Sequence, residues 1–88
     1  MYSIRLLKGA VEELARLDRA TGRRMMERLH WLAANAAAIR PEPLKGGLRG
    51  LYKLREGDYR IIYELLPQQR LILVHCIGHR REVYRRTK

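Results

Sequence analysis

Two kinds of residue are scarce in this 88-residue sequence: cysteine, and residues with acidic side chains. The single cysteine, Cys76, cannot build a disulfide framework, and its place in the apolar run "LILVHCIG" indicates a buried thiol in a reducing compartment. No apolar run is long enough to cross a membrane and no signal peptide is recognisable. We therefore expect a cytoplasmic protein with no membrane partner.

Metal-binding and phosphate-loop patterns are also missing. No set of cysteines and histidines has the spacing of metal ligands, and no glycine pattern resembles a phosphate-binding loop. We expect neither a metal nor a cofactor. The length suits one domain over residues 1–88, without repeats or a linker.

Positive charge is abundant. The chain has 19 basic and 9 acidic residues and a net charge of +10, which favours a polyanionic partner, either nucleic acid or an acidic protein. Arginine outnumbers lysine 15 to 4. Guanidinium groups suit bidentate contacts with phosphate, although an arginine-rich codon usage would produce the same bias.

Hydrophobic periodicity predicts an α+β fold. Residues 2–7 alternate as in a half-buried strand, whereas residues 8–18 and 19–38 have the three/four spacing of helices, with Asp18 as a cap for the second. A connector rich in proline and glycine follows, "IRPEPLKGGLRG". The expected order is an N-terminal strand, an antiparallel helix pair, a three-stranded antiparallel meander that completes one sheet (51–56, 59–66 and 70–77), and a short C-terminal segment.

Gly57-Asp58 has the composition of a two-residue hairpin turn, and such a turn fixes the register of the strands on either side. It places Arg55 opposite Arg60 and Lys53 opposite Ile62. One face of the hairpin then carries three cations and the other is apolar: Tyr52, Leu54, Ile61, Tyr63 and Leu65. We expect the apolar face to pack on the helices and the cationic face to stay open. Opposed like charges destabilise a sheet unless an anion lies between them.

The C-terminal segment "IGHRREVYRRTK" gathers more basic residues around an aromatic ring: His79, Arg80, Arg81, Tyr84, Arg85 and Arg86. Phosphate contacts and a ring for stacking are what single-stranded RNA needs. A solvated sheet face alone would be ordinary. Together with the basic C-terminal segment, the cationic sheet face indicates an RNA-binding surface. His75 is more typical of a hydrogen-bonded interior histidine, while His30 and Trp31 suit either the edge of the core or contact with a partner.

The segments "LKGGLRGLYKLREGDYRIIYE" and "VHCIGHRREVYR", after a strand and a helix pair headed by "KGAVEELARLD", resemble the RelE/ParE toxin superfamily, in particular its RelE-like messenger-RNA endonucleases. The resemblance spans nearly the whole chain. It implies the toxin of a type II toxin-antitoxin pair, which cuts messenger RNA in the ribosomal A site. The implied partners are an acidic antitoxin, the ribosome and its message, and operator DNA through the antitoxin complex.

The resemblance also implies site residues. Lys53 and Arg55 match the paired basic residues of the family's second strand, and Arg60 matches the arginine of its "Y-R" strand. The remaining matches are Lys45 in the "L-K-G" loop and Arg80 and Tyr84 in the C-terminal segment. His79 and Arg55 stand where members of the family differ, so the identity of the base stays open.

Metal-free RNA cleavage needs a base for the 2'-hydroxyl, cations for the phosphorane and an acid for the leaving oxygen. Arg60 and Arg80 are candidate phosphate donors. Lys53 is a candidate base because nearby cations disfavour its charged form. His79 is a better candidate acid than Arg80, because the intrinsic pKa of arginine is too high for it to give up a proton readily. Tyr84 would stack on a base, and Lys45, Arg81, Arg85 and Arg86 would bind RNA.

Two other functions remain open from the sequence. A ParE-like protein shares the fold but inhibits DNA gyrase without cutting RNA, and we expect it to lack the set of Lys53, Arg55, Arg60 and Tyr84. A non-catalytic nucleic-acid-binding co-repressor has the same composition.

Overall fold

The computed structural model describes residues 1–44 and 50–86, apart from the side chains of residues 84–86. Its elements are, in chain order, β1 (Ser3–Leu6), α1 (Lys8–Arg16), α2 (Arg19–Asn35), β2 (Glu42–Pro43), β3 (Leu51–Glu56), β4 (Tyr59–Leu66), the short 3-10 helix η1 (Pro67–Gln69), β5 (Leu71–His79) and α3 (Arg80–Arg86). The strands form one sheet in the order β1-β5-β4-β3-β2, in which β1 runs parallel to β5 and the other pairs are antiparallel. The expected α+β class is confirmed.

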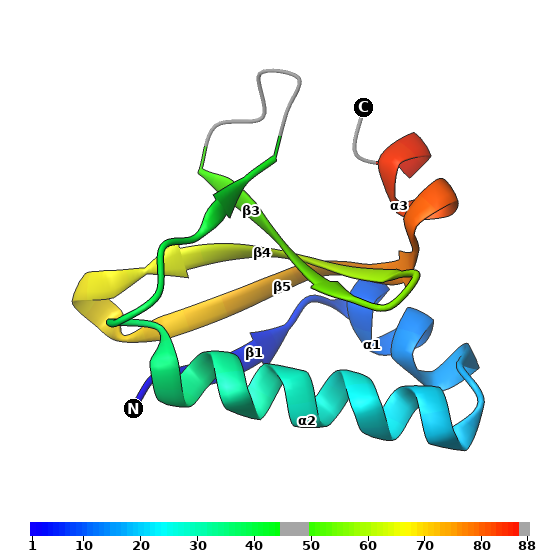
Figure 1. Cartoon of the computed structure of the whole chain (residues 1–88), viewed down its shortest axis with the longest axis horizontal. Coiled ribbons are helices and arrows are strands. Elements are labelled where there is room, and N and C mark those ends of the chain that lie inside the picture. Colours follow the sequence, from blue (N-terminus) through cyan, green and yellow to red (C-terminus); the bar gives the residue numbers. More distant parts are fainter. Residues whose placement is uncertain (45–49, 87–88) are drawn as a thin grey trace.

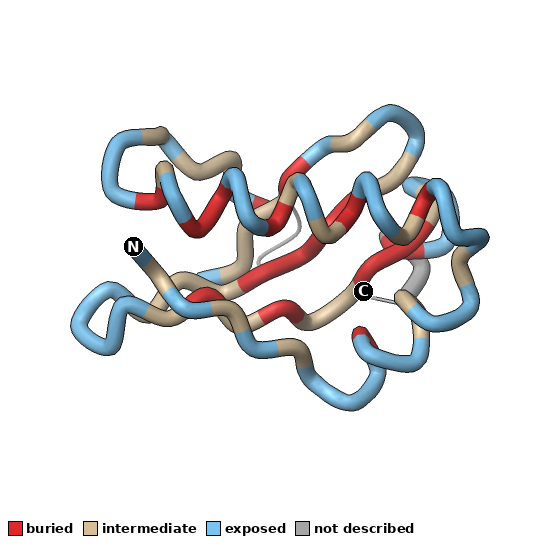
Figure 2. Tube along the Cα trace, turned by 90° about the horizontal axis from the view of Figure 1, so that it is seen from below, coloured by how far each residue is buried: buried red, intermediate tan, exposed pale blue. Residues whose placement is uncertain are grey.

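Helices α1 and α2 cover one face of the sheet (Figure 1). Buried positions recur along α2 among exposed ones (Figure 2), because the apolar residues Met25, Leu29 and Leu32 repeat at helical spacing. They pack with Ile61 and Tyr63 of β4 in the main core. Asp18 caps α2 as expected, since its carboxylate accepts a hydrogen bond from the Thr21 N–H at 3.2 Å. No helix in the described ranges is long and apolar enough to span a membrane.

The β3–β4 hairpin has the register that the sequence predicts. Arg55 pairs with Arg60 and Lys53 pairs with Ile62. Gly57 has a φ of 60°, which a turn of this kind requires at its first central position and which glycine adopts at no steric cost. The apolar side of the hairpin lies in the main core, as expected.

The expectation that the other face stays open is wrong. The C-terminal segment forms a helix, α3, which lies on the side of the sheet away from α1 and α2 (Figure 1). Val83 of α3 is fully buried against Ile62 of β4, and with Leu44 they form a second small core. An amphipathic turn of helix buries apolar surface there that the sheet would otherwise expose to water.

Two further details differ from the sequence interpretation. The connector contains the two-residue strand β2, which pairs with β3 and allows Pro43 because it is at the edge of the sheet. Strand β5 runs on to His79 and contains a bulge, since Ile62 pairs with Cys76 while Tyr63 pairs with Val74. The extra residue is His75, half-buried, whose Nε2 lies 3.1 Å from Oε1 of Glu64.

Candidate active site

Lys53 and Arg55 of β3 share one carboxylate. Arg55 binds Glu42 of β2 in a bidentate manner, with Nε–Oε1 and Nη2–Oε2 distances of 3.1 and 2.7 Å, and Nζ of Lys53 lies 3.4 Å from Oε2. The pairing of Glu42 with Lys53 across the β2–β3 ladder brings these groups together. The two cations are thus held in place by an anion that the sequence interpretation did not include.

Hydrogen bonding from Arg55 lowers the pKa of Glu42 to about 2, with Lys53 adding a smaller effect in the same direction. Glu42 is therefore ionised at any physiological pH. The sequence interpretation places Lys53 beside cations, and the structure adds an anion, because its Nζ lies 3.4 Å from a carboxylate oxygen of Glu42. Three like charges on two strands are tolerated partly because Glu42 offsets two of them.

Arg60 is 7% exposed, although the sequence interpretation places it on an open face. Its Nη1 donates to the carbonyl oxygens of Gly57 and Tyr59, at 2.8 and 2.7 Å. Its Nε is buried and has no hydrogen-bond partner among the described atoms. A buried N–H without an acceptor is costly, and at a functional site it indicates that an acceptor arrives from outside.

Helix α3 begins beside the hairpin turn. The backbone N–H of Arg80 donates to the Asp58 carbonyl at 2.8 Å, which fixes the start of α3 against the β3–β4 turn. The side chains of Arg80 and Arg81 are exposed. Gly78 of β5 pairs with Arg60 of β4. Arg80 and Arg81 follow Gly78 by two and three residues, so α3 begins close to the strand position that carries the buried guanidinium.

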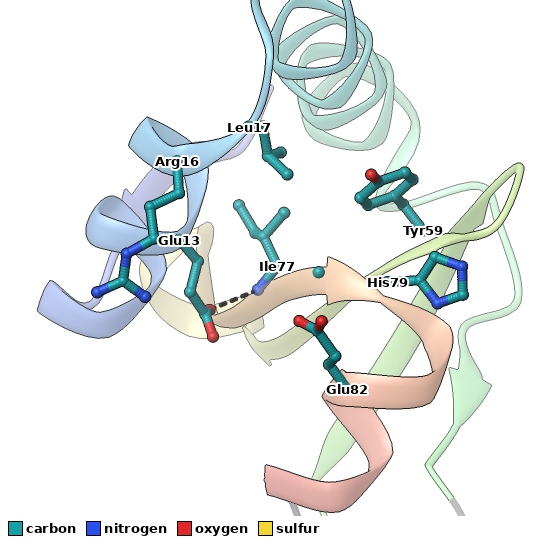
Figure 3. A pocket seen from close by; sticks show the side chains of 8 residues that line it. Glu13, Arg16, Leu17, Tyr59, Ile77, His79 and Glu82 are labelled. Atoms are coloured by element: carbon teal, nitrogen blue, oxygen red, sulfur yellow. Dashed lines mark hydrogen bonds between the residues drawn. The ribbon is translucent and has the colours of Figure 1, made fainter.

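His79 is placed differently from the sequence expectation, which put it beside the cations as an acid. Its side chain lines a pocket of about 250 Å³ with Tyr59, with Glu13 and Arg16 of α1, and with Glu82 (Figure 3). In that pocket Glu13 accepts a hydrogen bond from the Ile77 N–H at 2.9 Å. Nδ1 of His79 accepts from the Arg81 N–H at 3.3 Å, so this ring acts as an N-terminal cap of α3. Lys53 and Arg55 line a different pocket.

Some expected site residues lie outside the described part of the structure. They are Lys45 and the side chains of Tyr84, Arg85 and Arg86. Their roles stay predictions from the sequence. The residue that the sequence interpretation missed is Glu42, which it assigned to a connector. The pattern Pro41-Glu42-Pro43 could have indicated it, because proline favours an extended backbone before it and is accepted at sheet edges.

The described residues thus provide three cations on two neighbouring strands, one ionised carboxylate and two exposed arginines at the start of a helix. Such a set can bind a phosphate through guanidinium groups and can accept a proton at the carboxylate. It suits a substrate with a phosphodiester backbone.

Comparison with solved structures defines the fold as that of RelE toxins. The chain resembles the isolated Escherichia coli RelE toxin with a TM-score of 0.76, covering 100% of both chains at 18% identity. A chain of the RelBE2 toxin-antitoxin complex of Mycobacterium tuberculosis gives a TM-score of 0.79 at 22% identity, over 89% of this chain and 96% of that one. A chain of the RelE-RelB complex of Pyrococcus horikoshii gives 0.70 at 28% identity, over 90% and 94%.

The chain belongs to the family of ParE toxins of type II toxin-antitoxin systems, whose model matches residues 4–84. It is also 31% identical to toxin RelG of Mycobacterium tuberculosis over 45 residues, which are 51% of this chain and 52% of that protein. The match thus spans about half the length of RelG. The resemblance to the RelE/ParE toxin superfamily is confirmed.

Proposed function

We propose that this toxin is a metal-independent endoribonuclease that cuts messenger RNA in the ribosomal A site and so inhibits translation. The observation that carries the proposal is the buried guanidinium of Arg60, fixed by two carbonyl oxygens while its Nε has no partner among the described atoms. A phosphate oxygen is the acceptor that best suits a fixed, permanently charged donor. Arg60 would stabilise the charge that develops on the phosphorane.

Glu42 is the group we assign to proton removal, in place of Lys53 or His79. While Arg55 holds it, its low pKa makes it a weak base. When the RNA phosphate binds Arg55 and Lys53, the carboxylate loses its main partner and its pKa rises toward the ordinary value. The base then gains strength as the substrate binds, and Lys53 and Arg55 act as phosphate donors.

The leaving 5'-oxygen would take its proton from water, because His79 lies in another pocket and caps α3. Arg80 and Arg81 are exposed and can follow the RNA backbone beside the hairpin turn. Lys45, Arg85 and Arg86 would add phosphate contacts, and Tyr84 would stack on a base beside the cut. A message held bent on the ribosome needs only modest acid-base power, because positioning alone removes much of the barrier.

An acidic antitoxin is the second proposed partner. The solved structures that this chain resembles include complexes of RelE with RelB antitoxins. A net charge of +10 favours an acidic, amphipathic segment that covers the cationic strands. Operator DNA would be reached only through that complex.

The test uses ribosomes programmed with two matched messages, one native and one with a single 2'-deoxy nucleotide before the cut. If the 2'-hydroxyl is the nucleophile, only the native message is cut, and its products carry a 2',3'-cyclic phosphate and a 5'-hydroxyl. Both messages should retain the protein equally, because the phosphate contacts are unchanged. Chelators should have no effect.

Cleavage of the deoxy message, or products with a 5'-phosphate, would exclude this mechanism. Cleavage of neither message would favour a gyrase inhibitor of the ParE type or a non-catalytic co-repressor. Supercoiling by purified gyrase, measured with and without the protein, then separates those two.

A further inference from the structure

Trp31 is the only tryptophan in the chain, and it stands out on α2 as a large apolar side chain that is 41% exposed. It lines a cavity of about 250 Å³ along the edge of β3, between α2 and the connector that leads to β2. The charged residues that line the cavity with it are Arg28, Arg40, Glu42, Lys53 and Arg55. Three of them, Glu42, Lys53 and Arg55, belong to the proposed active site.

The indole is held in position by Arg28. The guanidinium carbon of Arg28 lies 4.2 Å from the centroid of the Trp31 ring, as in a cation–π pair. Arg28 is itself fixed to β3, because its Nε donates to the Arg55 carbonyl at 3.3 Å and lies 3.7 Å from a carboxylate oxygen of Glu56. The exposed ring surface is therefore part of a preorganised stack between α2 and β3, which lowers the entropy lost when a planar ligand binds.

Cations outnumber carboxylates around this ring. Four cations line the cavity, Arg28, Arg40, Lys53 and Arg55, against the single carboxylate of Glu42, which already binds two of them. An exposed aromatic ring among cations is the arrangement by which proteins bind single-stranded nucleic acid. The volume is below that of a typical drug-sized pocket, so it suits one base better than a helix of an antitoxin, which needs a long apolar groove.

We propose that Trp31 and Arg28 form a base-stacking subsite for a nucleotide of the RNA strand next to the one whose phosphate binds at Lys53 and Arg55. The base would lie on the exposed surface of the indole, and Arg40 would meet the backbone phosphate beside it. This inference rests on the proposed function, since it takes RNA as the substrate. It places part of the strand along the edge of β3 and against α2, away from α3 and the C-terminal tyrosine.

The test uses Trp31 as its own fluorescent reporter. The full-length protein is titrated with a 2'-deoxy tetranucleotide, which 2'-hydroxyl attack cannot cut, and with an abasic sugar-phosphate of the same length and charge. We expect the base-bearing strand to quench the emission and to bind roughly tenfold more tightly than the abasic one, as expected for one stacked base. Equal affinities without quenching by either strand would overturn the proposal.

Variants measured with end-labelled strands give the second arm. Trp31→Leu should reduce affinity for the base-bearing strand by roughly tenfold and leave the abasic strand unaffected. The matched control is Tyr59→Leu, which removes an aromatic ring from the pocket that contains His79 and should change neither affinity. Circular dichroism checks that both variants are folded. An equal loss with both strands in Trp31→Leu would show a structural effect and contradict stacking.

An acidic peptide tests the competing occupant. If oligoglutamate of matched charge shifts the Trp31 emission and neither strand does, the surface is a protein-docking site and the subsite is wrong. This test is separable from the test of the proposed function. If the protein cuts the native message on ribosomes but the Trp31 emission does not respond to bases, the subsite proposal is wrong and the proposed function stands. If the protein cuts no message but shows base-dependent quenching of Trp31, the endoribonuclease proposal is wrong and the base-stacking subsite is supported.

Discussion

Arg55 pairs directly with Arg60 across the β3–β4 hairpin, yet the two guanidinium groups have different environments. The side chain of Arg55 is 57% exposed and forms a bidentate ion pair with Glu42, whereas Arg60 is buried and donates to backbone carbonyls. One cation is thus paired with a solvent-accessible carboxylate, and the other is fixed in the fold. This difference decides which substitutions test function and which also test stability.

Arg60→Ala should destabilise the protein by about 1–3 kcal/mol, because it removes the donor for two carbonyl oxygens in a part-buried site. Arg60→Lys keeps the positive charge but loses the planar guanidinium with its several N–H donors. It should therefore reduce the rate of message cleavage more than the free energy of unfolding. An open cationic face would have left the stability unaffected, but this side chain is 7% exposed. Urea unfolding and cleavage of programmed ribosomes measure the two effects.

Arg80→Ala is the matched control for Arg60. Its side chain is exposed and its structural contact is made by the backbone N–H, which alanine keeps. We expect reduced toxicity and an unfolding free energy within about 0.5 kcal/mol of the original. Full toxicity of both Arg80→Ala and Arg60→Lys would remove these arginines from the site.

Glu42→Gln should change how stability depends on pH. The pKa of Glu42 is lowered in the folded state from 4.5 to about 2, so its ionised form stabilises the fold above pH 4.5 and this contribution is lost as the pH falls toward 2. The original protein should therefore exceed Glu42→Gln in urea midpoint at neutral pH, and the gap should close in that acidic range. A gap that stays constant down to pH 3 would contradict the ion pair.

The same variant tests the proposed base. Glu42→Gln should slow message cleavage on the ribosome while the protein is still retained there, because the phosphate donors Lys53 and Arg55 remain. Lys53→Met should instead weaken retention. If Lys53→Met is retained fully and only its cleavage is lost, Lys53 is the base and the assignment of Glu42 is wrong.

Substitutions of His79 distinguish a helix cap from a catalytic acid. His79→Ala should cost about 1 kcal/mol, because the Arg81 N–H loses its acceptor. His79→Asn should restore that stability, since asparagine is a favoured cap, and should retain cleavage. A stable His79→Asn protein that cannot cut the message would show that the ring has a chemical role in spite of its place beside α1.

Capture by an acidic antitoxin should depend on salt. Because the proposed contacts join an acidic segment to the exposed cations of this chain, the affinity should fall as ionic strength rises through the physiological range. Isothermal titration at several salt concentrations gives the slope. A complex that is insensitive to salt would indicate that apolar burial governs the interaction.

The hairpin shows how much local sequence can determine. Gly57 and Asp58 set a two-residue turn, and the alternation of side chains then fixes Arg55 opposite Arg60 and the apolar residues in the core. The helices follow from periodicity and the Asp18 cap for the same reason: each depends on residues within a few positions of one another. The composition, with its net charge of +10, predicts a polyanionic partner independently of the fold.

Other features depended on residues far apart in the chain. The sequence by itself determined strands β1, β3 and β4, most of β5, helices α1 and α2, the hairpin register and the family resemblance. Only the tertiary structure decided that Glu42 meets Arg55, thirteen positions away, that α3 covers Ile62 and that Arg60 is buried. It also separated His79 from the cations, because the pairing of β5 with β4 sets the face on which that ring lies. Hydrophobic periodicity predicts which side chains share one face of a helix or strand. Which of these side chains are buried or form ion pairs depends on how the elements pack together in the fold.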